Sequence, residues 1–411
     1  MKFRLLIATS LFLSLGGCGS TDNENTDSDT TVDLAAQAER IALESIIVDT
    51  HIDVPYRLYD EWEDVTVATE GGDFDYPRAV AGGLNAPFMS IYTPAELEAE
   101  GKSKERADAL IDLVMNIVES APDKFAIAKS VDEVEEQFSN GIISLPLGME
   151  NGSPVEGDLA NLQYFYDRGI RYITLAHSLT NHISDSSYDE NKPWDGLSEF
   201  GEEVVKEMNR LGIMVDISHV SDAAFYDVMA LTEIPAIASH SSARHFTPEF
   251  ERNMSDDMIK VLAGNGGVIM INYGSSFVTE EAQKYSKDRS AAYKTYIADN
   301  NLEKNDELNK EFNAAYDETH GGLPFADLED VLNHFDHVVA LTGIDHVGIG
   351  SDYDGVGDSL PTGLKDVASY PNLIEGLLAR GYSEENIKKI LGQNLLRVWR
   401  QVETAANDTT G

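Results

Sequence analysis

Short apolar segments alternate along this chain with longer segments in which apolar residues recur every three or four positions. The short segments show little strict alternation of apolar and polar residues, which is typical of strands buried on both faces. Eight of them can be counted: Ile46–Thr50, Pro87–Ile91, Ile142–Leu147, Arg171–Leu175, Ile213–Ile217, Ala236–Ser239, Val268–Asn272 and Val347–Gly350. We therefore expect eight buried strands.

The longer segments between them predict amphipathic helices. In the segment 104–120, for example, one face carries Ala107, Leu110, Leu113, Val114 and Ile117. Strands that alternate with helices predict a parallel sheet with right-handed crossovers, and eight such units predict a closed (β/α)8 TIM-type barrel. The alternative, an open doubly wound sheet, would more often carry a glycine-rich phosphate loop after the first strand, and none follows Ile46–Thr50.

Two regions depart from this alternation. The segment 273–323 is long and rich in lysine and glutamate, with Tyr, Phe and Ala at helical spacing. We interpret it as a helical insertion after the seventh strand. After the eighth strand, "NLIEGLLARG" and "SEENIKKILGQNLLRVWRQV" predict C-terminal helices. One barrel domain over residues 32–411 accounts for all of these elements.

The first residues have a different character. Lys2 and Arg4 precede the apolar run "LLIATSLFLSL", and "LGGC" follows, ending at Cys18, the only cysteine of the chain. This pattern resembles a bacterial lipoprotein signal, which implies a signal peptide over 1–17 and a lipid on Cys18; an ordinary secretory signal is the alternative. The polar segment 18–31 is expected to be a flexible acidic tether. The predicted location is the cell envelope, at the outer membrane or facing the periplasm.

The charge of the chain limits its partners. There are 72 acidic and 30 basic residues, giving a formal net charge of −42. Such a chain repels nucleic acid and anionic membrane surfaces, so we expect no nucleic-acid partner and membrane contact only through the lipid at Cys18. A well-solvated surface is sufficient to explain the acidity.

Ionisable residues occupy the ends of six predicted strands. The carboxyl ends of barrel strands meet at one mouth, so these side chains should lie close together. They are His51, Asp53, Glu150, His177, His219, His240 and Asp352. Any one of them alone is more often structural than functional, but imidazoles and carboxylates without thiolates suit zinc when they converge. The six other histidines are expected to be structural or exposed: His182, His245, His320, His334, His337 and His346.

The spacing of these residues suggests how they would share metal ions. His51 and Asp53 are two apart on an extended chain, so both can reach one ion. His219 and His240 could hold a second ion. Glu150 could bridge the two, because its carboxylate has two oxygens.

Several motifs in order make the chain resemble the membrane (renal-type) dipeptidase family, a zinc peptidase branch of the amidohydrolase superfamily. They are "VDTHIDVP", "GMENG", "YITLAHSLTN", "VDISHVS", "ASHSSAR", "RNMSD" and "VGIGSDYDGV". The resemblance implies a barrel with two zinc ions per chain that hydrolyses dipeptides, and a homodimer. It implies that His51 and Asp53 bind the first zinc, that His219 and His240 bind the second, and that Glu150 bridges them.

The resemblance also implies roles around the metals. His177 would contact the substrate, Arg252 would hold its terminal carboxylate, and Asp352 would act as acid and base. Two cations lower the pKa of a shared water toward ~7, giving a hydroxide that attacks the peptide carbonyl. One of the zinc ions and His177 would stabilise the oxyanion, and Asp352 would carry the proton to the leaving amine. Tyr92, in "FMSIYTP", could line the substrate pocket.

Two other functions remain open from the sequence. One is a different metal-dependent amidohydrolase, acting on N-acyl amino acids or lactams. The other is a solute-binding lipoprotein, which would share the anchor and tether but would normally have two lobes around a hinge and no metal cluster.

Overall fold

A computed structural model describes residues 33–409 of the chain. The predicted signal peptide 1–17, Cys18 and the predicted tether 18–31 lie outside the described residues. Residues 34–411 form one compact unit, which is described here by itself. Within the described part of the chain, every helix is too short or too polar to span a bilayer.

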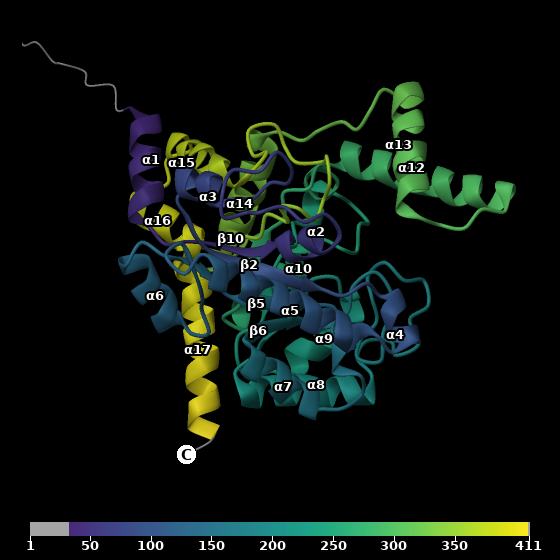
Figure 1. The fold of residues 1–411 in the computed structure, drawn as a ribbon, viewed down its shortest axis with the longest axis horizontal. Helices are drawn as coiled ribbons and strands as arrows, with labels where there is room; N and C mark the ends of the chain where they lie inside the picture. Colours follow the sequence, from purple (N-terminus) through teal and green to yellow (C-terminus); the bar gives the residue numbers. More distant parts are fainter. Residues whose placement is uncertain (1–32, 410–411) are drawn as a thin grey trace, which may run out of the picture. The chain divides into compact units, whose positions relative to one another are not determined.

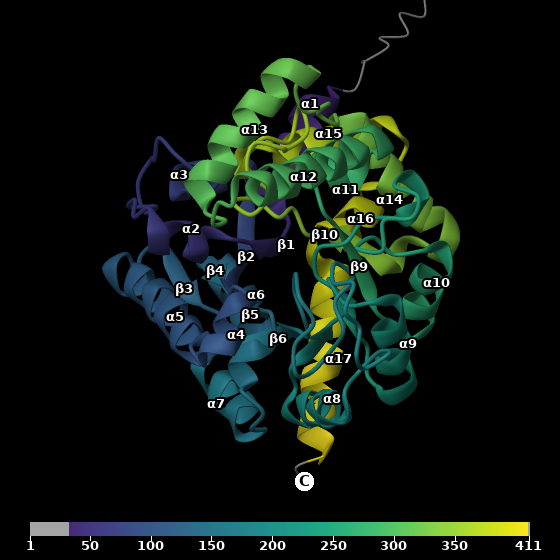
Figure 2. The same ribbon diagram turned by 90° about the vertical axis from the view of Figure 1, so that its right-hand side faces the viewer.

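Eight parallel strands close into a barrel (Figures 1 and 2). In chain order they are β1 (Ile47–Ile52), β2 (Leu84–Tyr92), β5 (Leu147–Glu150), β6 (Ile170–Thr174), β7 (Met214–Asp216), β8 (Ile237–Ala238), β9 (Val268–Ile271) and β10 (Val347–Ile349). Each strand pairs with the next, and β10 pairs with β1 through Asp49 and Ile349. This confirms the predicted (β/α)8 barrel and excludes the open sheet.

The third predicted strand, Ile142–Leu147, proved to cover parts of two strands. Its first part is β4 (Ile143–Leu145), which pairs with β3 (Phe125–Ile127) in a separate small sheet. Pro146 separates β4 from the barrel strand β5. Proline has no backbone N–H to donate to a ladder, so it falls where the chain passes from one sheet to the other. The barrel strand therefore begins at Leu147, and its carboxyl end carries Glu150 as predicted.

Helices surround the barrel (Figures 1 and 2). The larger ones are α1 (Leu34–Glu44), α5 (Ser103–Ser120), α6 (Val131–Ser139), α7 (Ala160–Arg168), α8 (Glu199–Leu211), α9 (Asp222–Leu231), α10 (Asp256–Gly264), α14 (Leu328–Thr342) and α15 (Tyr370–Ala379). Local sequence sets their ends. Ser198 accepts a hydrogen bond from the N–H of Gly201 at the start of α8, and Gly212 ends that helix at φ 83°.

The insertion after β9 is helical, as predicted. It contains α11 (Ser275–Val278), α12 (Glu280–Asn300) and α13 (Asp306–His320). Figure 1 shows α12 and α13 extending away from the strands. They pack on each other through aromatic rings, with 5.3 Å between the ring centroids of Tyr293 and Phe312.

The barrel interior is filled by large side chains. The ring of Tyr172 crosses the barrel so closely that a Cβ on Gly148 would lie 1.9 Å from it. Below it, the rings of Phe88 and Tyr172 are 5.4 Å apart, and those of Phe88 and Trp399 are also 5.4 Å apart. Trp399 comes from the C-terminal helix α17 (Asn394–Thr409), whose apolar face packs with the first residues of the strands, such as Val48. α17 therefore closes the amino-terminal end of the barrel.

Candidate metal centre

The carboxyl ends of the strands bring together the seven ionisable residues singled out in the sequence. His51 lies in β1 and Asp53 follows it, while Glu150 is the last residue of β5. The others lie in the segments after β6, β7, β8 and β10. Ligand atoms within 4.8 Å of one another form three overlapping groups: His51, Glu150 and His240; Glu150, His177 and His219; and His51, Asp53 and Asp352. The convergence expected from the barrel is therefore present.

Glu150 lies between two sets of ligand atoms. Its Oε2 atom is 3.5 Å from Nε2 of His51, which in turn is 3.4 Å from Oδ2 of Asp53. Its Oε1 atom is 3.1 Å from Nε2 of His219 and 3.2 Å from Nε2 of His240. The two oxygens thus face different histidines, His51 on one side and His219 and His240 on the other, which is the arrangement that a bridging carboxylate requires.

Hydrogen bonds orient two of the imidazole rings. The Tyr172 hydroxyl donates to the carbonyl of Thr50 and is 2.9 Å from Nδ1 of His51, so it accepts from that nitrogen. Ser239 Oγ donates to Asp216 and is 2.7 Å from Nδ1 of His240. The ring proton sits on Nδ1 in both cases, and the Nε2 lone pair points into the centre.

The pKa values of His219, His240 and Glu150 agree with this arrangement. His51 differs, because the effect of burial is outweighed by Tyr172, Glu150 and Asp53, which raise its pKa well above the ordinary value. Burial is the main cause that lowers the pKa of His219 and His240 well below the ordinary value, so both rings are neutral. Burial opposes the charge of Glu150, but the histidines around it hold its pKa well below the usual range. Neutral imidazole and ionised carboxylate are the forms that bind a metal ion.

Unpartnered atoms provide a test of whether the residues fit a metal. His51 Nε2, Asp53 Oδ1 and His219 Nδ1 are buried without a hydrogen-bond partner. The Nε2 atoms of His219 and His240 lie only 2.8 Å apart. Two neutral acceptor nitrogens at this distance repel each other unless a cation or proton lies near both. The donor set, with imidazole and carboxylate but no sulfur, fits zinc.

Asp352 lies beside this group in a buried position. Its Oδ2 atom accepts a hydrogen bond of 2.7 Å from the side-chain amide of Asn272. Burial, with the negative charges of Asp53 and Glu150, raises the pKa of Asp352 to about 7, while His51 and the Asn272 bond act in the opposite direction. A carboxyl group with a pKa near neutrality can both accept and release a proton at working pH.

Arg252 is a buried cation. It is 3% exposed, and its two terminal nitrogens donate to Ser241 Oγ and to the carbonyl of His240, each at 2.7 Å. Its Nε is buried without a partner. Within the described residues no carboxylate forms an ion pair with it. Arg252 therefore does not have the ordinary role of an arginine in a surface ion pair.

His177 and two tyrosines border the centre. Nε2 of His177 is 3.5 Å from Oε1 of Glu150, and its ring centroid is 4.3 Å from that of His219. Tyr92, at the end of β2, has its ring centroid 4.7 Å from that of His177. Tyr188, which the sequence did not single out, lies 6.0 Å from His219 by the same measure. These rings form a wall beside the metal-ligand atoms.

The backbone at the mouth adopts conformations that ordinary residues rarely take. His219 has φ 69° and Asp352 has φ 65°. Such left-handed positions cost of order 1 kcal/mol each and often occur at functional sites. Position 355 requires glycine for a steric reason, because a Cβ there would lie 2.2 Å from both Asp352 Oδ1 and Asp53 Oδ2.

Two other residues of the centre were not predicted from the sequence. Asn272 orients Asp352, and it ends the seventh predicted strand, so the rule that strand ends carry the chemistry could have found it. Tyr172 orients His51 from inside the barrel, and no local pattern marks it.

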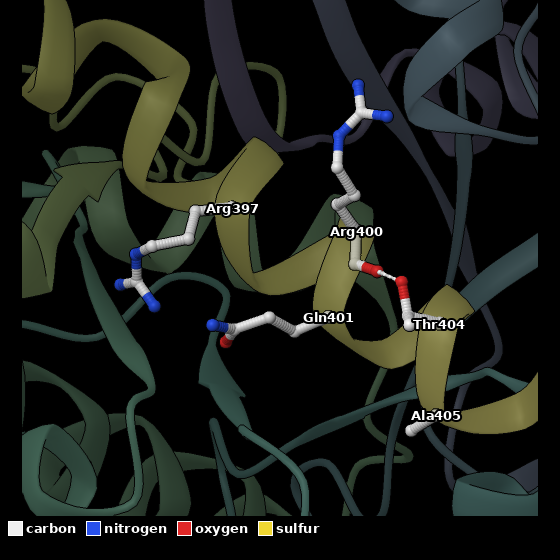
Figure 3. Close-up of a pocket in the computed structure, with 5 residues that line it drawn as sticks. All are labelled: Arg397, Arg400, Gln401, Thr404 and Ala405. Atoms are coloured by element: carbon white, nitrogen blue, oxygen red, sulfur yellow. Dashed lines mark hydrogen bonds between the residues drawn. The ribbon is translucent and has the colours of Figure 1, made fainter. Parts of the chain in front are cut away.

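A separate surface pocket lies along α17 (Figure 3). It is lined by Arg397, Arg400, Gln401, Thr404 and Ala405. Arg400 pairs with Asp132 at 2.6 Å and with Glu135 at 3.0 Å. None of the lining residues belongs to the metal-ligand set, so this pocket has no part in the chemistry of the centre.

A closed parallel barrel with imidazoles and carboxylates gathered at its mouth defines the class of metal-dependent barrel hydrolases. Residues 35–411 match the membrane dipeptidase family, peptidase family M19, and the chain belongs to that family. The chain is therefore a metallopeptidase of the dipeptidase class.

Solved structures agree with this assignment. The chain is 26% identical to a probable dipeptidase, PvdM, from Pseudomonas aeruginosa, with a TM-score of 0.79 over 91% of this chain and 99% of that one. It is also 26% identical to a metallo peptidase from Rhodobacter sphaeroides that was solved with a phosphinate mimic of L-Ala-D-Ala, with a TM-score of 0.70 over 87% of this chain and 100% of that one. A third structure, dipeptidase AC of family M19, gives 26% identity and a TM-score of 0.72 over 87% and 98% of the two chains.

Proposed function

We propose that this protein is a binuclear zinc dipeptidase that cleaves dipeptides with a free terminal carboxylate. The observation that carries the proposal is the position of Glu150. One of its oxygens lies near His51, which in turn contacts Asp53, and the other lies near His219 and His240. These five residues would hold the two ions.

Bound zinc ions would supply a water of lowered pKa and would polarise the scissile carbonyl. The chain's own residues would do the rest. Arg252 presents a buried guanidinium without a carboxylate partner, which suits the terminal carboxylate of a short peptide. His177 lies at the edge of the centre, where its ring can donate to the developing oxyanion.

Asp352 would carry the proton. Its pKa of about 7 permits it to take a proton from the attacking water and to give it to the leaving amine. Asn272 holds one of its oxygens, which leaves the other directed toward Asp53 and His51. Tyr92 and Tyr188 would border the side chains of the substrate.

Metal removal tests the proposal most directly. Dialysis against a chelator is expected to abolish hydrolysis of L-Ala-L-Ala and L-Ala-D-Ala, and added zinc is expected to restore it. By elemental analysis, the zinc content should fall by two ions per chain when the ligands of the centre are replaced. Full activity of a protein shown to be free of metal would overturn the proposal.

A substrate panel separates the dipeptidase from the other amidohydrolase. Amidation of the dipeptide's carboxylate removes the partner of Arg252, so kcat/KM is expected to fall about 10- to 100-fold, the effect of losing a charge-assisted hydrogen bond. Faster turnover of N-acyl amino acids or lactams than of any dipeptide would favour the alternative. The solute-binding alternative would need two lobes around a hinge, whereas residues 34–411 are one compact unit.

We further propose that a lipid on Cys18 anchors the protein at the cell envelope, with the barrel facing the periplasm or carried by the outer membrane. The support is the sequence pattern alone, "LLIATSLFLSLGGC". In a bacterial host, the full-length chain is expected in the membrane fraction and its Cys18→Ser variant in the soluble fraction. Equal partition of the two would contradict the anchor.

A further inference from the structure

A second group of metal-type side chains lies outside the candidate metal centre. Its members are His245, Asp256 and His337, which share no residue with the centre. One ligand atom of each lies within 4.8 Å of the others. They come from three elements: the short helix Arg244–Phe246 after β8, the first residue of α10, and α14. The sequence reading took both histidines as structural or exposed.

The contacts within the group are those of a site built from three donors. Nε2 of His337 is 2.7 Å from Oδ1 of Asp256. The rings of His245 and His337 stack with centroids 4.4 Å apart and an angle of 21°. A simple ion pair between Asp256 and His337 would not require His245 nearby. The imidazole of His245 nevertheless lies close to both residues.

The backbone around His245 is fixed on both sides. The N–H of Arg244 donates to the carbonyl of Met254 at 2.8 Å, and the Arg244 guanidinium forms two bonds, of 2.8 and 2.6 Å, to Asp222. On the other side, the ring centroid of Phe246 lies 4.4 Å from that of His334. These contacts fix the backbone on both sides of His245 before any ligand arrives.

His334 ties this segment to α14. It is buried, its Nδ1 accepts from the N–H of Ala243 at 3.0 Å, and its Nε2 donates to the carbonyl of Val278 at 2.9 Å. Because His337 follows one helical turn later, the position of His245 relative to His337 is set by these bonds. The backbone positions of the two histidines are therefore set by the fold.

The surroundings favour a cation. His245 is exposed and the other two side chains are half-buried, so an ion would be accessible and would keep an open coordination position. The chain's formal charge of −42 raises the local concentration of cations. Two imidazoles and one carboxylate are a donor set that zinc and similar divalent transition metals prefer over calcium or magnesium.

We propose that His245, Asp256 and His337 bind one further divalent transition-metal ion, zinc being the expected ion, at a site separate from the hydrolytic centre. The ion joins the segment between β8 and α10 to both α10 and α14. That segment also carries His240 and Arg252, so the ion stabilises the part of the chain that supplies a metal ligand and the substrate's anchor.

Zinc counting tests this site. The full chain and its His245→Ala/His337→Ala variant are equilibrated with excess zinc, freed of unbound metal by gel filtration and measured by elemental analysis. We expect one zinc fewer per chain in the variant. The control His320→Ala removes an exposed histidine that stacks on Tyr316 at 3.8 Å, and it should keep the wild-type count. Equal counts in the double variant and the wild type would overturn the site.

Two further measurements test the site separately from misfolding of the double variant and from the proposed hydrolytic function. The single variant His245→Ala leaves the Asp256–His337 contact in place, and the rise in Tm on zinc addition should shrink in it because less ligand binds the folded state. An unchanged rise would also contradict the site. The Glu150→Gln variant, which disables the hydrolytic centre, should still bind the ion at His245, so failure of one site does not imply failure of the other.

Discussion

Replacement of Asp352 by asparagine is expected to lower kcat for dipeptides by about a hundredfold or more, with the metal content unchanged. Asparagine keeps the size of the side chain and can still bond to Asn272, but it cannot accept and return a proton. The pKa of about 7 places Asp352 where both proton transfers are favourable at neutral pH. Its loss should therefore act on turnover more than on KM.

Steady-state kinetics and elemental analysis of the same preparation check this prediction. Asp358→Asn is the matched control, because it removes one carboxylate from an exposed position in the same loop. It should retain wild-type kcat and zinc. Near-normal turnover in Asp352→Asn would remove that residue from the proton transfer. A loss of zinc would instead make Asp352 a ligand, which its place beside His51 and Asp53 permits geometrically.

Replacement of Glu150 by glutamine is expected to have an even larger effect, a fall of about a thousandfold or more in kcat/KM, equivalent to about 4 kcal/mol of transition-state stabilisation. Glutamine offers one oxygen and an amide NH2 group, so it cannot bridge two ions. It also leaves the imidazoles of His51, His219 and His240 without the carboxylate that faces them. We expect weaker retention of at least one zinc ion.

The measurement is kcat/KM together with zinc retained after gel filtration, and far-UV circular dichroism establishes that the variant is folded. Glu136→Gln, an exposed position on α6, is the control for loss of one negative charge. If Glu150→Gln kept both ions and most of its activity, the bridging role would be wrong and the two halves of the centre would have to act separately.

The sequence contained enough information to predict the barrel and to gather the residues of the centre. In a closed parallel barrel the carboxyl ends of all strands meet at one mouth. A polar residue just after an apolar strand is therefore expected to lie at that mouth. His51, His219 and His240 follow this rule. The helical insertion was equally predictable, because helical spacing is a local property of 273–323.

Contacts across the barrel were not predictable in the same way. The orientation of His51 depends on Tyr172, which reaches over Gly148 from another strand. The division of 142–150 into β4 and β5 depends on which neighbour each half meets. The group of His245, Asp256 and His337 could be recognised only once the relative positions of three elements were known. Such features follow from packing between segments distant in sequence, and periodicity does not encode them.

The position of Trp399 has a consequence for how the protein is made. The barrel's interior is completed by a side chain from α17, which contacts Phe88 of the second barrel strand. A ribosome that has released only the strands has therefore produced a cylinder with one end open and its apolar interior accessible to water. Final folding must wait until the segment containing Trp399 has emerged.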